Sequence, residues 1–515
     1  MAFTLTVAEL IDADTSGLLG KHPKWERVPL ADVASILNGA PFDSALFSRT
    51  DGLPLVRIRD VIAGETATYY KGAYEDAYLV QQGDLLVGMD GDFNSGLWGT
   101  RTALLNQRVC KISPTEAFYD KRLLALALPG YLAAINANTP SVTVKHLSSK
   151  TIGEIELALP PRAEQARIVA KLEELLSDLD AGVAELKAAQ RKLVQYRQSL
   201  LKAAVEGALT IEWRSQNTPT ETGAQLLQRI LAERRERWKA KQRAKFKEQG
   251  KSPPKDWEAK YTEPVQPDSA GMPGLPEGWV WASVEQLGRV QLGRQRSPSK
   301  IGKENPTPYI RAANITEGGV DMNDVLEMEF SETEKQTFAL KVGDVLLTEA
   351  SGSPEHVGRP AIWRKSHSLY CFQNTVLRFS PDGIGSEFAF YTFLAMQKLG
   401  VFSKLSGGVG INHLSAGKFS RLPVPLPPAD EQIALIEIIE EGLLRCADQL
   451  VVNTHILKQS TAQRQNILRA AFAGQLVPQD PNDEPASALL ARIRAERAVL
   501  EATQKPRGRK PKALA

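Results

Sequence analysis

The sequence predicts an α+β protein in which a long antiparallel two-helix coiled coil separates two sheet-rich α/β domains related by a pseudo-two-fold internal repeat. Three observations predict this fold class. The chain has 515 residues, too many for one hydrophobic core, and such a length indicates roughly two to four domains. The sequence repeats itself at a fixed displacement. Leucines then recur every seven residues after a Leu-Pro-Pro triplet.

The repeat is clearest where each helical stretch begins. The motif Leu-Pro-Pro-x-x-Glu-Gln at residues 159–165 returns at residues 426–432, a displacement of 267 residues. The same displacement relates His-Leu-Ser at 146–148 to His-Leu-Ser at 413–415. Weaker repeated motifs lie upstream, and their displacements differ from 267 residues, which indicates insertions in surface loops. The repeat is far longer than the repeats of solenoid proteins. It therefore indicates the duplication of a whole domain together with its helical spacer.

Each globular half carries short β-like runs separated by Gly-rich and Pro-rich loops. Such runs lie at residues 84–87 and 109–112 in the first half, and at 344–348 and 375–379 in the second. This pattern predicts a mixed, sheet-rich domain in each half.

A heptad pattern follows each globular half. The first copy places leucines seven residues apart, at Leu172, Leu179, Leu186, Leu193 and Leu200. The second copy has a softer seam, with Ile436, Leu443, Leu450 and Leu457 accompanied by Ile439, Cys446 and Asn453. Two narrow apolar stripes are buried when the helices pair, and an inward Asn can fix their register. Antiparallel pairing over about 40 residues gives a rod of ~60 Å with one domain at each end.

These patterns predict six segments. They are a first globular domain at 1–160, a first helical spacer at 161–211, a charged helix and linker at 212–276, a second globular domain at 277–427, a second helical spacer at 428–477, and a C-terminal helix with a basic tail at 478–515.

Charge gives only local hints of a polyanion partner, because the net charge is +3. Residues 229–255 hold eleven Lys or Arg against three Asp or Glu, interleaved with Trp238 and Phe246. This stretch fits either phosphate contact or a solvated helix with ion pairs four residues apart. The cationic, Pro-rich residues 505–512 are expected to form a tail attracted to DNA.

Several other classes of protein are not favoured. Cys110, Cys371 and Cys446 are widely spaced and odd in number, so they are expected to be reduced packing residues and not metal ligands. The first 20 residues lack the pattern of a secretory signal and no apolar run spans a bilayer, so a cytoplasmic protein is expected.

Catalytic signatures are also missing. No phosphate-binding loop, dinucleotide-binding turn or magnesium-dependent nuclease centre is found. The repeated His146 and His413 are interpreted as hydrogen-bonded structural residues rather than catalytic ones. The sequence therefore predicts no catalytic residue and no metal site in this chain.

A variable domain, then Leu-Pro-Pro-x-x-Glu-Gln, then a leucine heptad helix ending in Leu-Lys-Ala-Ala-Val-Glu-Gly, all repeated once, closely resembles the specificity subunits of Type I restriction-modification systems. The resemblance covers nearly the whole chain. It implies two target recognition domains, each reading half of a bipartite double-stranded DNA site, and repeated helices that form an antiparallel spacer and bind methyltransferase subunits. The basic extension at 212–268 departs from this pattern.

The resemblance also implies the partners and cofactors. Two modification subunits would methylate adenine N6 with S-adenosylmethionine, and ATP- and magnesium-dependent motor-nuclease subunits would cleave DNA, in a role in phage defence. This chain would hold no cofactor and would supply only the recognition of the DNA sequence. There are two alternatives. One is a stand-alone DNA methyltransferase, which would need acceptor-site and cofactor motifs that are absent. The other is a coiled-coil scaffold that binds DNA without sequence preference or not at all.

Polar, Gly-rich loops supply the candidate DNA-binding residues. In the first domain they are Arg57, Arg59, Asn94, Arg101 and Lys145, and in the second Arg311, Asn314, His356, Arg359 and Asn412. The repeated Arg57 and Arg311 are alternatively expected to satisfy internal carboxylates. Because the two domains differ in sequence, the expected DNA site is asymmetric.

Overall fold

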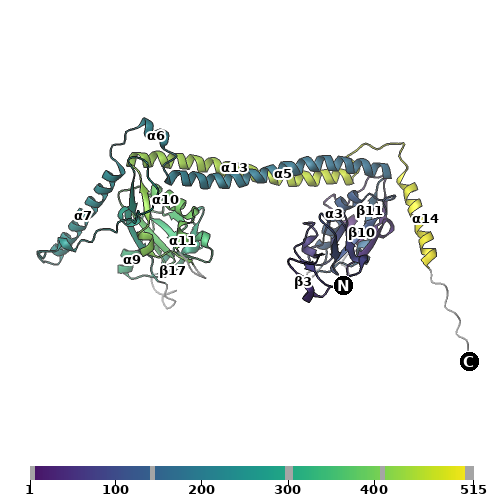
Figure 1. Cartoon of the computed structure of the whole chain (residues 1–515), viewed down its shortest axis with the longest axis horizontal. Helices are drawn as coiled ribbons and strands as arrows, with labels where there is room; N and C mark the ends of the chain where they lie inside the picture. Colours follow the sequence, from purple (N-terminus) through teal and green to yellow (C-terminus); the bar gives the residue numbers. More distant parts are fainter. Residues whose placement is uncertain (1–5, 140–144, 296–305, 406–411, 505–515) are drawn as a thin grey trace, which may run out of the picture. The chain divides into compact units, whose positions relative to one another are not determined.

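The computed structural model describes residues 6–139, 145–295, 306–405 and 412–504 (Figure 1). The chain forms two compact units. Unit 1 comprises Met1–Lys187 and Thr454–Ala515, and unit 2 comprises Ala188–Asn453. Each unit therefore combines one sheet domain with helical segments from both halves of the sequence.

Unit 1 contains three small sheets. The four-stranded antiparallel sheet has the order β2 (Ala34–Asn38), β10 (Val109–Pro114), β7 (Leu85–Gly88), β8 (Asn94–Leu97). The five-stranded sheet has the order β3 (Phe47–Ser48), β5 (Tyr69–Tyr70), β4 (Leu53–Val56), β9 (Ala103–Leu105), β6 (Leu79–Val80), and β1 (Glu26–Pro29) pairs with β11 (Glu156–Leu159). Its short helices are α1 (Val7–Asp12), α2 (Leu30–Val33), α3 (Lys121–Ala137) and α4 (Ser149–Gly153).

Unit 2 repeats this plan. Its four-stranded antiparallel sheet has the order β13 (Gly288–Leu292), β22 (Val376–Pro381), β18 (Val345–Thr348), β20 (Pro360–Ile362). The smaller sheets are β17 (Leu326–Glu329), β14 (Pro306–Ile310), β21 (Cys371–Phe372); β12 (Val280–Ser283) with β24 (Pro423–Leu426); β15 (Ile315–Thr316) with β16 (Gly319–Val320); and β19 (Ala350–Ser351) with β23 (Asn412–His413). The domain helices are α8 (Val284–Leu287), α9 (Glu332–Phe338), α10 (Ser386–Lys398), α11 (Val401–Leu405) and α12 (Ala416–Ser420).

Strand pairing shows that the two domains are structural repeats. Gly88 pairs with Val109 in unit 1, and Thr348 pairs with Val376 at the same place in unit 2. Both domains also contain one parallel pair, β4 with β9 and β14 with β21. The mixed helix-and-sheet fold with two repeated domains is therefore confirmed.

Two 44-residue helices, α5 (Arg162–Val205) and α13 (Ala429–Phe472), contribute to both units. Within unit 1, Asp180 forms an ion pair with Arg464, while Glu164, earlier in α5, bonds to Gln479, beyond the end of α13. Within unit 2, Leu200 lies against Gly442, and Arg214, after α5, reaches Glu431 near the start of α13. In each unit the paired segments run antiparallel, as predicted.

The heptad residues line the contact between these helix segments. Leu172 and Leu200 are buried, and the seam residues between them, Leu179, Leu186 and Leu193, are half-buried among exposed neighbours. On α13, Ile439, Cys446 and Asn453 are buried, and Ile436, Leu443, Leu450 and Leu457 are half-buried. The inward position predicted for Asn453 is confirmed by its 7% exposure.

The repeated Glu-Gln pair anchors the start of each long helix. The Gln165 amide donates to the Phe118 and Pro160 carbonyls at 3.0 Å, and its oxygen accepts from the Asp120 amide at 2.8 Å. Glu164 accepts a hydrogen bond of 2.9 Å from the Trp25 indole, and Glu431 accepts one of the same length from Trp279. Because these buried polar atoms are satisfied only in this arrangement, the motif fixes how the helix leaves the sheet.

The charged segments after the long helices also fold as a repeat. They contain α6 (Ile211–Gln216), α7 (Gly223–Glu248) and α14 (Ala486–Gln504). Leu226 and Ile230 of α7 are buried in the core of unit 2, and Leu489 and Ile493 of α14 are buried in that of unit 1. Each segment thus returns to cover a sheet domain.

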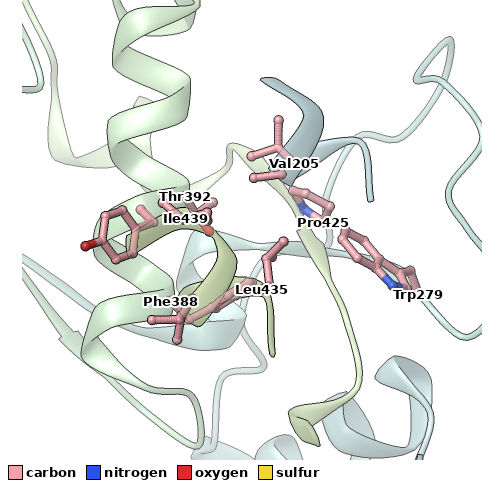
Figure 2. Close-up of a pocket in the computed structure, with 10 residues that line it drawn as sticks. Val205, Trp279, Phe388, Thr392, Pro425, Leu435 and Ile439 are labelled. Atoms are coloured by element: carbon pink, nitrogen blue, oxygen red, sulfur yellow. The ribbon is translucent and has the colours of Figure 1, made fainter. Parts of the chain in front are cut away.

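The joint between helices and domain in unit 2 is tightly packed. In Figure 2, Val205 of α5, Leu435 and Ile439 of α13 and Phe388 of α10 surround a gap beside Trp279. Its volume is about 10 Å³, close to the minimum that one water needs. An equivalent gap of about 10 Å³ lies in unit 1, where Ile168, Ala471 and Phe472 contribute to its lining. We interpret both gaps as packing joints and not as ligand sites.

The cysteines are buried and free, as predicted. Among the helices in the described part of the chain, none combines the length and apolar character needed to cross a bilayer. Within residues 6–139, 145–295, 306–405 and 412–504, no group of three or more His, Cys, Asp or Glu is arranged to hold a metal ion. The basic residues 505–512 lie outside the described residues.

Candidate nucleic-acid interface

Most of the predicted DNA-binding residues of unit 1 gather where β7 ends. The turn at Ile58–Asp60 carries Arg57 and Arg59, and it packs beside Gly88, the last residue of β7. A Cβ on Gly88 would lie 3.0 Å from the Ile58 side chain and 2.7 Å from the Asn94 side-chain oxygen. The absence of a side chain at Gly88 therefore lets this turn and Asn94 approach the same strand end.

Lys145 and His146 complete this group. The Gly91 amide donates to the Lys145 carbonyl at 2.9 Å, and the Leu147 amide donates to the Met89 carbonyl at 2.7 Å. The Lys145 ammonium caps the end of α3 through the Asn136 carbonyl at 2.6 Å. We call residues 57–60, 88–94 and 145–147 the strand-end cluster of unit 1.

A charged network that the sequence did not predict braces this cluster. The His146 Nδ1 lies 2.5 Å from an Asp90 carboxylate oxygen, and Arg108 lies 3.1 Å from the other oxygen. His146 and Arg108 are half-exposed, while Asp90 is mostly covered. His146 is hydrogen-bonded, as predicted. Its partners were missed because Asp90 and Arg108 are distant from it in sequence and carry no repeat signal.

Arg101 lies apart from the strand-end cluster. It follows β8 at the end opposite Asn94, and its guanidinium sits 5.5 Å from the centre of the Tyr69 ring. Its carbonyl accepts a hydrogen bond of 2.8 Å from the Trp98 indole. The structure therefore groups four of the five predicted residues of the first domain and separates the fifth.

The strand-end cluster of unit 2 comprises residues 311–314, 348–359 and 412–414. The Ala312 amide donates to the Thr375 hydroxyl at 3.1 Å, and the Glu349 amide donates to the Thr375 carbonyl at 2.8 Å. His413 lies 3.2 Å from the Glu349 carboxylate, a clasp like that of His146 with Asp90. The two domains therefore build this region in the same way.

Two predicted residues of unit 2 have internal roles. Asn314 is 2% exposed, accepts from the Arg311 amide, and donates to the Asp321 and Asp324 carbonyls. It holds its loop and leaves no group facing outward, so the prediction that it contacts DNA does not fit its position. Arg311 pairs with Asp324, which agrees with the alternative expectation of an internal carboxylate. Arg57 is exposed, and no carboxylate among the described residues pairs with its side chain.

Asn94 and Arg359 occupy equivalent positions in the two clusters. Asn94 pairs with Gly88 at the end of β7. At the end of β18 the Thr348 amide donates to the Arg359 carbonyl at 3.1 Å, and the Arg359 amide donates to the Thr348 hydroxyl at 3.0 Å. Within the described residues, a buried polar atom of each lacks a partner, Oδ1 of Asn94 and Nε of Arg359. The Arg359 guanidinium also donates to the Ile315 carbonyl at 3.5 Å.

The two remaining predictions are only partly described. His356 is exposed, and its carbonyl accepts from the Thr348 hydroxyl at 2.5 Å, so its backbone lies at the same strand end as Arg359. The backbone of Asn412 pairs with Ser351 in β23, and its side chain lies outside the described residues.

Comparisons with known proteins agree on one family. The family model described as the Type I restriction modification DNA specificity domain matches residues 23–188 and 276–441. The Type I restriction enzyme EcoBI specificity subunit of Escherichia coli is 35% identical over 516 residues, covering 97% of this chain and 98% of that protein. The EcoKI specificity subunit of Escherichia coli strain K12 is 23% identical, covering 93% and 97%.

A solved structure has a similar fold. It comes from work on the structural basis of complex assembly and conformational transition of the type I R-M system. The TM-score is 0.59 at 16% sequence identity, and the match covers 88% of this chain and 98% of that one.

Proposed function

Because this chain belongs to the Type I restriction-modification DNA specificity family, we propose that its two repeated domains read the two halves of one asymmetric, split DNA sequence. The observation that carries the proposal is the pair of equivalent positions held by Asn94 and Arg359. In the major groove, Asn pairs with adenine N6 and N7, whereas Arg pairs with guanine O6 and N7. One fold that presents different groups at one place supports two half-sites of different sequence.

The strand-end clusters have the composition that such contacts need. Arg57 and Arg59 are exposed at the same strand end as Asn94, with Arg59 3.8 Å from the Asp60 carboxylate. Arg57 would contact phosphate oxygens, while Asn94 supplies a group of the kind that reads bases. Phosphate contacts position a protein on DNA, and base contacts specify the sequence. The His-carboxylate clasps hold the loops of each cluster in place, which favours base contacts of defined geometry.

In this proposal the catalytic groups reside on partner subunits. Relatives of this chain are named specificity subunits of Type I restriction enzymes, and the structural neighbour comes from a study of R-M complex assembly. Two modification subunits would transfer the methyl group of S-adenosylmethionine to adenine, which must leave the base stack to be reached. Motor-nuclease subunits would use ATP and magnesium. This chain would supply the recognition of the DNA sequence.

The test is to co-express the chain with its modification subunit in a host without other adenine methylation, and to map methylated adenines by single-molecule sequencing. The expected result is one motif with two short, different parts around an unread gap. A continuous or palindromic motif would contradict the asymmetric reading. A stable complex that leaves the genome unmethylated would favour a scaffold role.

A second measurement addresses catalysis. The purified chain alone, incubated with labelled S-adenosylmethionine and DNA carrying the mapped motif, is expected to transfer no label. Transfer that persists in the absence of the modification subunit would overturn the proposal that this chain is non-catalytic.

A further inference from the structure

A basic arm projects from unit 2. It consists of α7 and the returning segment 249–276, which we call the arm (Figure 1). The Trp238 and Trp257 rings stack with centroids 5.8 Å apart, and Tyr261 meets Trp238 edge-on at 5.4 Å. Phe246 lies against Trp257 at 6.0 Å. These aromatic contacts hold the returning segment against the helix, so the arm has a defined structure of its own.

The base of the arm is fixed to the sheet domain. The Arg234 guanidinium donates to the Glu285 carbonyl, and the Ser283 hydroxyl donates to the Val265 carbonyl at 2.6 Å. The Val265 amide donates to the Glu285 carboxylate at 3.2 Å. Both α7 and the returning segment are thus bonded to α8 or to the residue before it. The charges on the arm are therefore held at set positions relative to the second domain.

A cavity of about 470 Å³ opens between the arm and the domain. Five cationic side chains line it: Arg234, Arg237, Lys241, Lys260 and Arg289. Asp382 is the one carboxylate among its lining residues in the described chain, and it pairs with Arg237. Arg237 also lies 3.6 Å from Glu233. Even with both acids counted, cations are in excess, and like charges gathered in one place repel each other unless an anion joins them.

Three of the five cavity cations belong to a row along α7 that continues past the cavity to Lys245. Arg234, Arg237, Lys241 and Lys245 are spaced three or four residues apart on α7, which places them on one face of the helix. The row is ~16 Å long at ~1.5 Å per residue. Because a DNA strand carries a phosphate at every nucleotide, a row of this length can face more than one phosphate. A chain of phosphates fits this row better than a single small anion does.

Ion pairs leave most of the cations that line the cavity uncompensated. Other basic residues of α7 are paired, Arg229 with Glu221, Arg235 with Glu263 and Lys239 with Glu236. In contrast, Lys241, Lys260 and Arg289 are exposed, and no carboxylate among the described residues pairs with them. The ion pairs predicted for a solvated helix are thus present, and they leave Lys241, Lys260 and Arg289 of the cavity without a carboxylate partner among the described residues.

In the described part of unit 1, the residues at the equivalent place differ. Arg289 pairs with Ser380 in the sheet of unit 2, and in unit 1 the corresponding pair is Ser35 with Ser113. The helix α14, which is the counterpart of α7, directs Arg497 to Asp32 in an ion pair. Among the residues that the structure describes, the cationic pair of α7 and β13 in unit 2 is thus replaced in unit 1 by a serine pair and an ion-paired arginine.

The cavity also lies away from the strand-end cluster of unit 2. Arg289 and Pro381 are at one end of the four-stranded sheet, where Gly288 pairs with Pro381, whereas Arg359 lies beside Thr348 at the other end. Residues that read bases and residues that line the cavity thus face different places. On the basis of the proposed function, we infer that the arm and cavity bind the phosphate backbone of duplex DNA beyond the half-site read by the second domain.

The test uses the full chain assembled with its modification subunit. Lys241→Ala, Lys260→Ala and Arg289→Ala are combined in a cavity variant. Lys247→Ala, Lys251→Ala and Lys255→Ala form a control that removes the same charge from exposed positions of the arm outside the cavity lining. Binding is measured against salt on duplexes that carry the methylated motif with long flanks, or with either flank trimmed to a few base pairs.

The cavity variant is expected to bind the long duplex at least tenfold more weakly, with a salt slope smaller by about 2 to 3, since each lost phosphate contact removes ~0.9. Trimming one particular flank should abolish this difference, and trimming the other should not. The control variant should stay within about twofold of wild type. The methylated motif should be unchanged in both variants.

Three results would overturn the inference. They are wild-type binding by the cavity variant, a loss that survives trimming of either flank, and an equal loss in the control. The cavity variant could also fail to assemble with the modification subunit while any complex that forms still binds DNA normally. That result would overturn the inference and assign the cavity to an acidic surface of the partner protein. Failure of the proposed function is distinct, because the wild-type complex would then show no motif at all.

Discussion

Asn94 and Arg359 hold the same place in the two domains and carry different hydrogen-bonding groups. If each reads a base, Asn94→Ala should weaken binding by ~1 to 3 kcal/mol through one base pair of one half-site, and Arg359→Ala should do so in the other half-site. Competition binding with every base pair of the motif substituted in turn measures this.

Arg101→Ala serves as the control, because Arg101 lies at the other end of β8, over the Tyr69 ring. It should leave base preference unchanged. Loss of preference in the same half-site for both Asn94→Ala and Arg359→Ala would contradict the assignment of one domain to each half.

The buried thiols give a second test at the residue scale. Burial raises the pKa of Cys110 and of Cys371 to about 12, and the thiolate is the form that reacts. A raised pKa removes thiolate at every pH below it, so at about pH 8 neither residue should react with a disulfide reagent in the native chain. The unfolded chain should release the signal of three thiols. Rapid native labelling at Cys110 or Cys371 would show that these cores open.

At this scale, sequence reasoning separated roles only partly. Arg311 pairs with the exposed carboxylate of Asp324, whereas Arg57 has no carboxylate partner among the described residues, and the buried role of Asn314 was not foreseen. An Asn in a polar loop can turn inward or outward, and only the carbonyls of Asp321 and Asp324 around it decide which.

The start of α13 depends on one buried carboxylate. Glu431 is 0% exposed and binds Arg214, the Thr210 hydroxyl and the Trp279 indole. Glu431→Gln leaves Arg214 without its counter-charge in a mostly buried position, so unit 2 should lose about 3 kcal/mol of stability. Chemical denaturation measures the loss. Glu437→Gln, at an exposed position of the same helix, should change stability by less than ~0.5 kcal/mol. Equal effects of the two variants would show that the contacts of Glu431 with Arg214, Thr210 and Trp279 do not stabilise unit 2.

Two glycines within the long helices should respond differently to Ala. A Cβ on Gly182 of α5 would meet no neighbouring atom within 4 Å, so Gly182→Ala should stabilise the chain by roughly 0.5 to 1 kcal/mol. At Gly442 of α13 a Cβ would lie 2.7 Å from a methyl of Leu200. Gly442→Ala should therefore gain less than Gly182→Ala, by about 1 kcal/mol. Thermal unfolding of both variants measures the difference, and equal gains would show that the helices are not closely packed at Gly442.

At the scale of whole elements, the sequence predicted well. Heptad spacing located both long helices, because a stripe repeating every seven residues can be buried only by a partner helix. The strand pairing within each domain was beyond prediction, since the short strands carry little periodic signal and the parallel pairs join residues far apart in the chain.

At the scale of the molecule, unit 1 is completed by the far end of the chain. Gln479 bonds to Glu164, Asp483 pairs with Arg167, and Leu489 and Ile493 are buried in the unit 1 core. Deleting residues 478–515 should destabilise unit 1 by ~3 to 6 kcal/mol from the two apolar side chains alone. Limited proteolysis should then cut first within residues 6–187, while unit 2 stays intact. Cleavage first in unit 2 would contradict this dependence.

The sequence by itself determined the duplication, the two long helices, their antiparallel pairing within each unit and the family resemblance. These features follow from local periodicity and repeated motifs, which are written along the chain. The tertiary structure alone decided that the described residues 454–504 join the first domain, that Asn94 and Arg359 are equivalent, and that cations from α7, the returning segment and β13 share one cavity. The physical reason is that these relations depend on contacts between distant residues, whose free energy arises only when the fold brings them together.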